Sequence, residues 1–366
     1  MRAWRLARLW GISIQIDPSW LFIFGLLTWQ LATLQLPQWH PDWPLWSTWG
    51  LAIVTSLLFF ASVLLHELAH SFAALRLGIP VQSVTLFLFG GVARITKEPD
   101  RPGVEFLVAI VGPLTSFLLG VGFGLLWLLG GIFHWPFSTE LEILALNNLL
   151  LAGFNLLPGF PLDGGRLLRA ALWFLGGNIL TATRIATWAG QGLAALFVVG
   201  GLVQTLRLQD PSWFWFVLVG WFLGVAATAS YRQLRIREAL RAVPVAALMQ
   251  PGYPLLPSSL ALSQATPYLQ SAPDRALPVV DFGRLVGLLL LSEVQRLPAP
   301  AWACTTVGQA MTPAARLTAV APQSAASQLQ FGEREDTPVL VVAEGRLVGL
   351  VGPSAVRQFI KARRLG

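Results

Sequence analysis

The sequence predicts a polytopic α-helical membrane protein of about six spans, followed by a smaller soluble α/β region. The chain has 366 residues, of which 55% are hydrophobic and only 12% are charged, whereas soluble domains average about 25% charged residues. Several apolar stretches reach the roughly 20 residues that a spanning helix needs. After Arg241 the composition changes to that of a soluble α/β domain.

The charge pattern favours a membrane surface over nucleic acid as the partner of the basic residues. The formal net charge is +7, and such an excess is typical of cytosolic loops beside an anionic leaflet. The lone cysteine, Cys304, excludes an intramolecular disulfide framework and any zinc site built from cysteines. Residues 1–16 are basic and amphipathic, so we expect them at the cytosolic interface as a retained segment, not as a cleaved signal peptide.

Apolar runs separated by prolines, tryptophans or charges define the predicted spans. They cover residues 18–36, 48–77, 104–131, 141–174 (interrupted at 155–165), 184–206 and 212–230. Basic residues cluster at 2–8, 94–101, 166–184 and 232–241. Because cytosolic loops carry this excess, both termini are predicted in the cytosol of a multi-pass membrane protein.

Residues 80–96 break the helical pattern between the second and third spans. Val, Thr and Phe dominate this segment, and Gly90-Gly91 offers a turn, so a β-hairpin is expected. If the hairpin enters the membrane, its open edge must be covered by protein or filled by a bound strand.

The second span carries an H-E-x-x-H pattern, His66-Glu67-Leu68-Ala69-His70, after a run without charge from Leu51 to Leu65. Residues four apart share a helix face, so both imidazoles can bind one Zn²⁺ ion with Glu67 beside it as general base. A chance match would have to place ionisable groups in hydrocarbon, where even an Asp costs about 2.5–3.5 kcal/mol. The sequence therefore predicts an intramembrane metal site.

Two histidines leave a catalytic zinc ion one protein ligand short. Asp163 is the preferred third ligand, because it lies in the interrupted fourth span and two glycines that permit close helix approach follow it. The alternative is that Asp163 caps a half-helix. His40 and His134 lie in predicted outer loops and are poor candidates, and Glu142 is the remaining carboxylate of the fourth span.

These residues together resemble the site-2 protease family of intramembrane zinc metalloproteases. The resemblance rests on HELAH, on Gly90-Gly91 in the hairpin, on Gly112-Pro113 in the third span, and on N-x-x-P-x-x-x-L-D-G-G in the fourth. It covers roughly residues 10–230. It implies one Zn²⁺ ion per chain, held by His66, His70 and Asp163, with Glu67 as general base.

The resemblance also implies how a substrate is held. Asn155 is expected to orient the substrate or to stabilise the oxyanion, since an amide can donate to developing negative charge; a plain interhelical hydrogen bond is the alternative. The hairpin at Phe89-Gly90-Gly91 resembles a segment that holds an unwound substrate by strand addition. The implied substrate is a single-span transmembrane protein, cut within or near the bilayer.

The region after Arg241 repeats itself. Residues 245–251 echo 307–313, and 277–294 echo 337–356, at a period of about sixty residues. Two copies that bury one another's apolar faces would make one compact domain. The repeats resemble a tandem CBS pair, with copies at 244–299 and 304–362 after a membrane domain at 1–235.

CBS pairs often bind adenine nucleotides, and the usual pattern closes each repeat with Gly-x-x-Thr-x-x-Asp. In the first repeat the Thr and Asp positions hold Leu290 and Glu293, and in the second they hold Gly352 and Ala355. Glu293 is thus the one weak candidate for a nucleotide contact. Packing, or formation of a homodimer through the CBS pair, is the alternative role.

Two function classes are compatible with these residues. The leading prediction is a protease in which the CBS pair is regulatory. The alternative is a CBS-regulated transporter or channel that uses His66, Glu67, His70 and Asp163 as an ion path. A catalytically inactive scaffold is disfavoured because every expected catalytic group is present. Zinc content together with peptide-bond cleavage separates the two classes.

Overall fold

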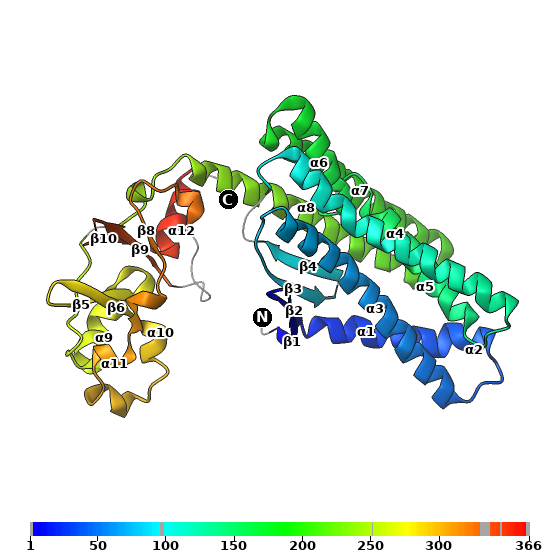
Figure 1. Ribbon diagram of the computed structural model, residues 1–366, viewed down its shortest axis with the longest axis horizontal. Coiled ribbons are helices and arrows are strands. Elements are labelled where there is room, and N and C mark those ends of the chain that lie inside the picture. Colours follow the sequence, from blue (N-terminus) through cyan, green and yellow to red (C-terminus); the bar gives the residue numbers. More distant parts are fainter. Residues whose placement is uncertain are drawn as a thin grey trace. The chain divides into compact units, whose positions relative to one another are not determined.

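The computed structural model of the chain describes residues 3–88, 90–95, 99–250, 252–329, 337–344 and 346–363. These residues form two compact units, Met1–Tyr231 and Arg232–Gly366. The first unit combines long helices with a small sheet, and the second combines short strands with short helices (Figure 1).

Five helical segments of the described residues are long and apolar enough to cross a membrane. In the first, α1 (Ser19–Gln30) continues through a π-helical turn into α2 (Leu36–Trp39). The others are α3 (Leu45–Arg76), α4 (Pro102–Ile132), α7 (Ile179–Leu208) and α8 (Phe214–Arg241), the last preceded by a 3-10 turn. Each coincides with a predicted span, because an apolar run of this length can satisfy its backbone in lipid only as a helix.

The predicted fourth span consists of two helices, α5 (Ser138–Asn155) and α6 (Asp163–Gly176), separated by residues 156–162. The predicted interruption is therefore present. Neither helix is among the five candidate spans, so the total of about six remains a prediction. A Cβ atom at Gly165 would overlap the backbone of Gly159 and Phe160. The glycines after Asp163 thus let the connecting segment lie directly against α6.

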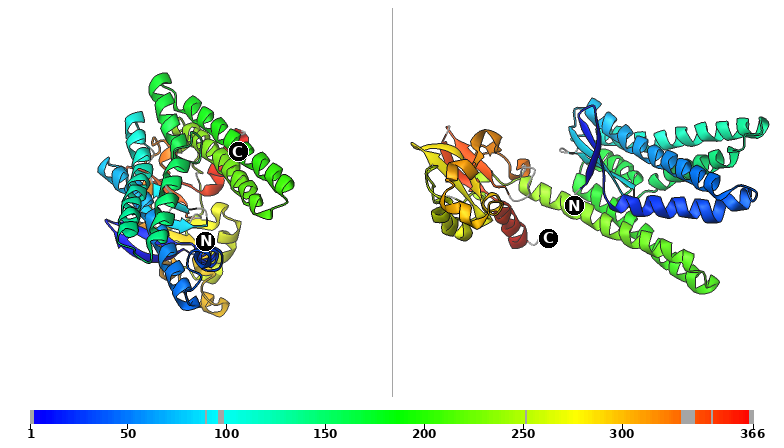
Figure 2. Two further views of the ribbon diagram at one scale, coloured as in Figure 1. Left: turned by 90° about the vertical axis from the view of Figure 1, so that its right-hand side faces the viewer. Right: turned by 90° about the horizontal axis from the view of Figure 1, so that it is seen from below.

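A four-stranded sheet lies at one end of the helices of this unit (Figures 1 and 2). Its strands are β1 (Trp4–Leu9), β2 (Ile12–Ile16), β3 (Val81–Phe87) and β4 (Gly90–Ile95), in spatial order β1-β2-β3-β4. The β2–β3 pair is parallel, and the other two pairs are antiparallel. The β-hairpin predicted after the second span is confirmed as β3–β4.

The N-terminal segment differs from the sequence-based expectation. Residues 1–16 were expected to form an interfacial segment, and no strand was predicted there, yet β1 and β2 join the sheet. Ile12, Ile14 and Ile16 are buried, which is the period of two that a half-buried strand shows. The pairing partner of β2 is β3, far along the chain, so no local pattern could reveal the parallel pairing.

Hydrogen bonds and apolar packing join the sheet to the helices that carry the predicted site. The backbone N–H of Asp17 donates to Leu86 in β3 at 2.9 Å. Ser19 donates to the Asp17 carboxylate from its hydroxyl at 2.6 Å and its backbone N–H at 3.0 Å, and these bonds lower the pKa of Asp17. Beneath the sheet, Ala74 of α3 and Val108 of α4 belong to the same buried cluster as the strand residues. The C-terminal part of α3 is thereby fixed beside the sheet.

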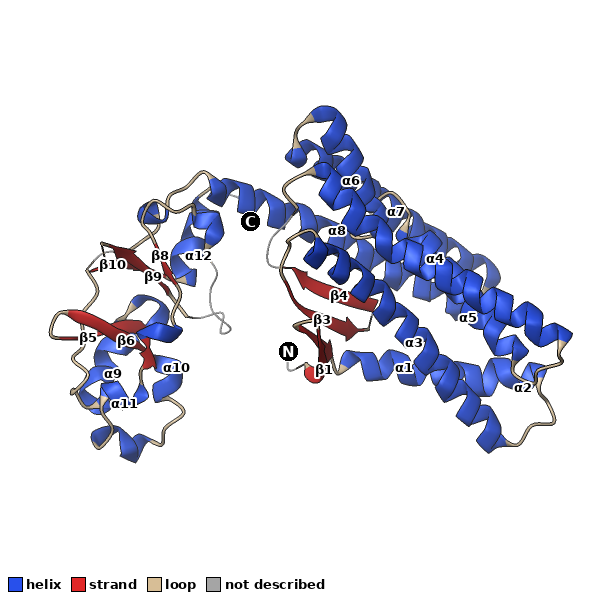
Figure 3. Cartoon of the chain, viewed as in Figure 1, coloured by secondary structure: helices blue, strands red, loops and turns tan. Residues whose placement is uncertain are grey.

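The second unit contains two three-stranded sheets (Figure 3). One has the order β5-β6-β7 and the other β10-β9-β8. The strands are β5 (Ala276–Asp281), β6 (Arg284–Leu290), β7 (Thr312–Pro313), β8 (Ala319–Val320), β9 (Val339–Ala343) and β10 (Arg346–Val351). Helices α9 (Leu262–Ser271), α10 (Leu291–Val294), α11 (Val307–Ala310) and α12 (Pro353–Ala362) flank them. Each repeat contributes one hairpin, β5–β6 in the first copy and β9–β10 in the second.

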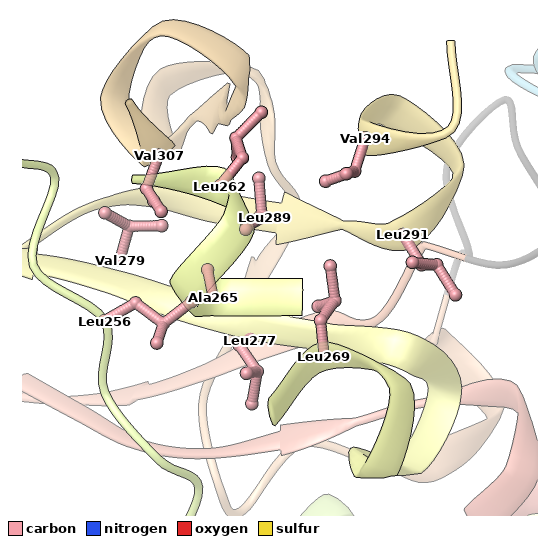
Figure 4. Close-up of a cluster of buried hydrophobic side chains, with 10 residues drawn as sticks. All are labelled: Leu256, Leu262, Ala265, Leu269, Leu277, Val279, Leu289, Leu291, Val294 and Val307. Carbon is pink, nitrogen blue, oxygen red and sulfur yellow. The ribbon is translucent and has the colours of Figure 1, made fainter. Parts of the chain in front are cut away.

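Each repeat completes the sheet of the other. Thr312, in the second repeat, pairs with Leu288 in the first hairpin, and Gln250, in the first repeat, pairs with Leu350 in the second hairpin. A buried cluster accordingly draws on both copies, with Val307 of the second repeat packed among residues of the first (Figure 4). The mutual burial expected for the two copies is present.

Candidate metal centre

The two histidines of HELAH lie one turn apart on α3, as their spacing predicts. The helix continues unbroken from Leu45 to Arg76, and Gly78 follows it with a φ of 77°, a conformation that glycine adopts without steric cost. Both imidazoles are buried, and the Nε2 atoms of His66 and His70 are 3.2 Å apart. The pair therefore presents two nitrogen donors to one point.

Asp163 completes a group of three. Its Oδ2 atom lies 3.2 Å from His66 Nε2 and 3.0 Å from His70 Nε2. In the part of the chain that the structure describes, these three form the one group of at least three such side chains that could hold a metal ion. The N-cap of α6 is Leu162, and no side-chain cap bond is present. The alternative that Asp163 acts as an N-cap is therefore wrong.

The three side chains fit a zinc ion. Ligand atoms about 2.1 Å from one tetrahedral zinc ion lie about 3.4 Å from one another, close to the separations observed here. Two imidazoles and one carboxylate are also a typical catalytic donor set, which leaves a fourth position open. A Cβ atom at Gly112 of α4 would overlap Nε2 of His70 and would lie 2.8 Å from that of His66. Glycine at this position leaves the space that the group occupies.

Helix α4 orients both imidazoles through their other nitrogen atoms. Nδ1 of His70 donates to the carbonyl oxygen of Val108 at 2.7 Å, so Nε2 of that ring is left to accept or to bind a metal. Nδ1 of His66 lies 2.9 Å from the hydroxyl of Ser116, which is fully buried. Sequence reasoning missed both contacts. The available signal was Ser116, a polar residue four positions after Gly112 in an apolar span.

Glu67 lies against strand β4. A Cβ atom built at Gly91 would be 2.8 Å from Cδ and 3.0 Å from Oε1 of Glu67, so a side chain at position 91 would displace this carboxyl group. Gly90 has a φ of 129°, a conformation that favours glycine. The expected turn at Gly90-Gly91 is not where the structure has it, because both glycines begin β4 and pair with Phe87 and Leu86. Gly91 of this pair is thus placed beside the expected general base. Phe89, the third predicted hairpin residue, is outside the described residues.

The contacts of the other sequence candidates are made elsewhere in the first unit. Asn155 ends α5, and its amide nitrogen donates to Leu151 of the same helix at 3.0 Å, not across to another helix. His40 stacks on Trp43 and lies 3.4 Å from Glu140.

Three further candidate residues lie outside the metal group. His134 lies in the connection before α5 with a φ of 54°, and Glu142 is exposed on α5. Glu293 lies in α10 of the second unit, where it accepts a hydrogen bond from Arg296 at 3.1 Å. The structure brings none of these three residues into the group formed by His66, His70 and Asp163.

Known proteins resemble the chain along nearly its whole length. A family model described as Peptidase family M50 matches residues 54–134 and 130–199. The chain is 34% identical over 362 residues to a relative from Synechocystis sp. that is named as a zinc metalloprotease. This match covers 96% of the chain and 94% of the relative.

Two solved structures are similar to parts of the chain. A site-2 protease from Methanocaldococcus jannaschii is 30% identical with a TM-score of 0.43, and the match covers 62% of this chain and 94% of that one. The CBS domain of a bacterial CNNM/CorC family Mg²⁺ transporter is 19% identical with a TM-score of 0.30, covering 36% and 82%. On the family model and the full-length relative, the chain belongs to peptidase family M50, the site-2 protease family of membrane-embedded zinc metalloproteases.

Proposed function

We propose that this zinc metalloprotease cleaves a single-span transmembrane protein within or near the bilayer. The carrying observation is the position of the His66, His70 and Asp163 group, which is buried among helices long and apolar enough to cross a membrane. His66 lies ten residues before the end of α3 at Arg76, which is about 15 Å along the helix axis. A site at this depth suits a peptide bond that enters from the membrane.

The side chains at the site have different chemical roles. His66, His70 and Asp163 would hold the zinc ion, and Ser116 and the Val108 carbonyl keep the imidazoles turned toward it. A bound zinc ion supplies Lewis-acid chemistry, polarising a carbonyl group and making water more acidic. Glu67 accepts a proton from the attacking water and delivers it to the leaving amine.

Asn155 is proposed as a contact to the substrate. Its side-chain amide nitrogen carries two N–H donors, and one of them is engaged by Leu151. Asn155 is also the last residue of α5, immediately before the break that leads to Asp163. The second donor is therefore proposed to orient the substrate or to stabilise the oxyanion.

Strand β4 is proposed to hold the substrate. Among the described strands β4 pairs with β3 alone and forms one edge of the sheet, whereas the opposite edge of β3 is covered by β2. A helical substrate has its backbone groups engaged, so it must unwind before a strand can add to this edge. Since Gly91 of β4 contacts Glu67, strand addition here would bring the substrate backbone to the general base.

The second unit is proposed to regulate the protease through packing between its repeats, or through a homodimer. Asp274 of the first repeat accepts bonds from Ser354 of the second, from the backbone N–H at 2.8 Å and the hydroxyl at 2.7 Å. A Cβ atom at Gly352 would overlap this carboxylate. Gly352 stands where the nucleotide-binding pattern has Thr, so the space for that side chain is already filled. This favours packing over an adenine nucleotide.

Both termini are proposed to be cytosolic. Basic residues cluster around the N-terminal segment, the β3–β4 hairpin, the start of α6 and the end of α8. Cytosolic loops are enriched in such residues, so these four places are assigned to one side of the membrane.

The decisive experiment compares the membrane proteomes of cells that express wild type and Glu67→Gln. A single-span protein should accumulate uncut in the variant, while purified protein keeps its zinc content, because Glu67 acts on water without binding the metal. Glu142→Gln, the same change at an exposed carboxylate of α5, should cleave like wild type. Unchanged cleavage in Glu67→Gln would contradict the proposal and favour the transporter or channel alternative.

A further inference from the structure

One face of α4 contacts both histidines of α3. Val108 accepts from His70, Gly112 leaves space for both imidazoles, and Ser116 contacts His66. These positions are spaced four residues apart, so they form one stripe along the helix. Glu105 lies three residues before Val108 on the same side, and it is fully buried.

Glu105 does not contact the metal group; it pairs with α6, the helix that begins at Asp163. Nε of Arg169 donates to Glu105 Oε1 at 2.6 Å, and a second guanidinium nitrogen contacts the same oxygen. Arg169 is itself 8% exposed, and its guanidinium lies over the ring of Phe160. The other oxygen, Oε2, is buried without a hydrogen-bond partner among the described residues. Arg169 is therefore the described group that compensates this buried charge.

Helix α6 needs such an anchor. Its first turn carries Gly164 and Gly165, which pack by backbone alone and offer no side chain that could set the rotation of the helix. Asp163 is the first residue of α6 and Arg169 lies six residues later, about 9 Å along the axis. The ion pair at Arg169 thus joins α6 to α4 fewer than two helical turns after Asp163.

We propose that the Glu105–Arg169 ion pair positions Asp163 relative to His66 and His70. The pair completes a closed series of polar contacts among three helices. Helix α4 orients the histidines of α3, and these histidines face Asp163 of α6. Arg169, also on α6, then pairs with Glu105 of α4. Both are positioning residues that act through Asp163. This inference rests on the proposed role of the three side chains as zinc ligands.

The test measures zinc affinity and thermal unfolding of the full-length protein in detergent. Glu105→Gln and Arg169→Lys should each raise the zinc dissociation constant about 10- to 100-fold, as loss of an outer partner typically does, and cleavage should fall with zinc occupancy. The Lys variant keeps the positive charge and loses the planar guanidinium. Because the buried carboxylate still has a cationic partner, this variant is expected to fold, and a loss of zinc affinity in it is not explained by misfolding.

A double variant separates positioning from mere stability. Glu105→Met with Arg169→Met replaces a buried ion pair by apolar side chains, a change that often preserves stability. We expect a melting temperature near that of wild type, with zinc affinity still reduced at least 10-fold. Glu140→Gln is the matched control, because Glu140 is a buried carboxylate on α5 outside the metal group; it should lower stability and leave zinc affinity unchanged.

Two outcomes would overturn the proposal. One is wild-type zinc affinity in Glu105→Gln. The other is zinc affinity that simply follows the melting temperature through all variants, including the double one and Glu140→Gln. Asp163→Asn, measured in parallel, keeps the proposals distinct: if it loses zinc while the Glu105 variants do not, only the positioning role fails.

Discussion

The two units place their polar side chains in opposite ways. Among the described residues, Thr266 is the one buried serine, threonine, asparagine, histidine or charged residue of the second unit, and all the others lie in the first. A helix in lipid must turn such groups inward, because hydrocarbon does not solvate them, whereas a soluble domain can leave them in water. Buried polar side chains are therefore concentrated in the first unit, which also holds the metal group, whereas the described core of the second unit is almost entirely apolar.

The largest effect on zinc binding is expected at Asp163, the carboxylate of the buried group in the first unit. Asp163→Asn keeps the size of the side chain and removes the charge and the strong metal bond. Zinc affinity should fall by more than about 100-fold, since loss of an outer partner alone costs 10- to 100-fold, and cleavage should disappear with it. Elemental analysis beside the cleavage rate checks this. Full zinc content at a wild-type rate would remove Asp163 from the site.

A smaller loss of zinc affinity is expected at Gly112. This substitution tests whether the space beside the two imidazoles is as important as the charge of Asp163. Gly112→Ala places a methyl group against Nε2 of both histidines, so zinc affinity should drop, by about 10-fold or more if the imidazoles must shift. Gly122→Ala is the matched control on the same helix, where a Cβ atom meets nothing within 4 Å. There the helix should gain up to about 1 kcal/mol. Equal zinc affinity in the two variants would contradict the close packing at Gly112.

The smallest effect on the metal site is expected from the second unit. Asp274→Ala removes both bonds from Ser354, so the second unit should lose about 1–3 kcal/mol of stability while zinc content stays constant. Calorimetry of the full chain measures the loss. Asp274→Ala and Ser354→Ala should be non-additive, because the two residues contact each other. Zinc loss in either variant would show that the two units are energetically coupled.

The phenol of Tyr253 lies near the polar contact between the repeats. Burial, together with the nearby Asp274 carboxylate, raises the pKa of Tyr253 to about 12. Its hydroxyl is protonated at neutral pH, as that of an unperturbed tyrosine also is, and donates to Gln250 at 3.1 Å. Gln250 is the residue that crosses from the first repeat to pair with the second hairpin, so this bond supports the exchange of strands.

Local patterns were sufficient for the long helices and for two of the three side chains of the metal group. The length of the apolar runs located the five candidate spans, and the four-residue spacing of His66 and His70 placed both on one face, because an α-helix repeats every 3.6 residues. The hairpin at β3–β4 followed from its glycines and β-branched residues. The role proposed for Asn155 could not be read in this way, since it depends on where the break between α5 and α6 places this amide.

The sequence by itself determined that this chain is a membrane protein with HELAH on a spanning helix and with a twofold repeat after it, because each of these is a short-range property of the amino acids. Only the tertiary structure decided which carboxylate faces the histidines, which helix orients them and where the N-terminal strands pair. Asp163, Ser116 and β3 are all distant in sequence from their partners, and their contacts arise from packing. The Glu105–Arg169 pair is of this second kind, since neither residue carries a local signal of the other.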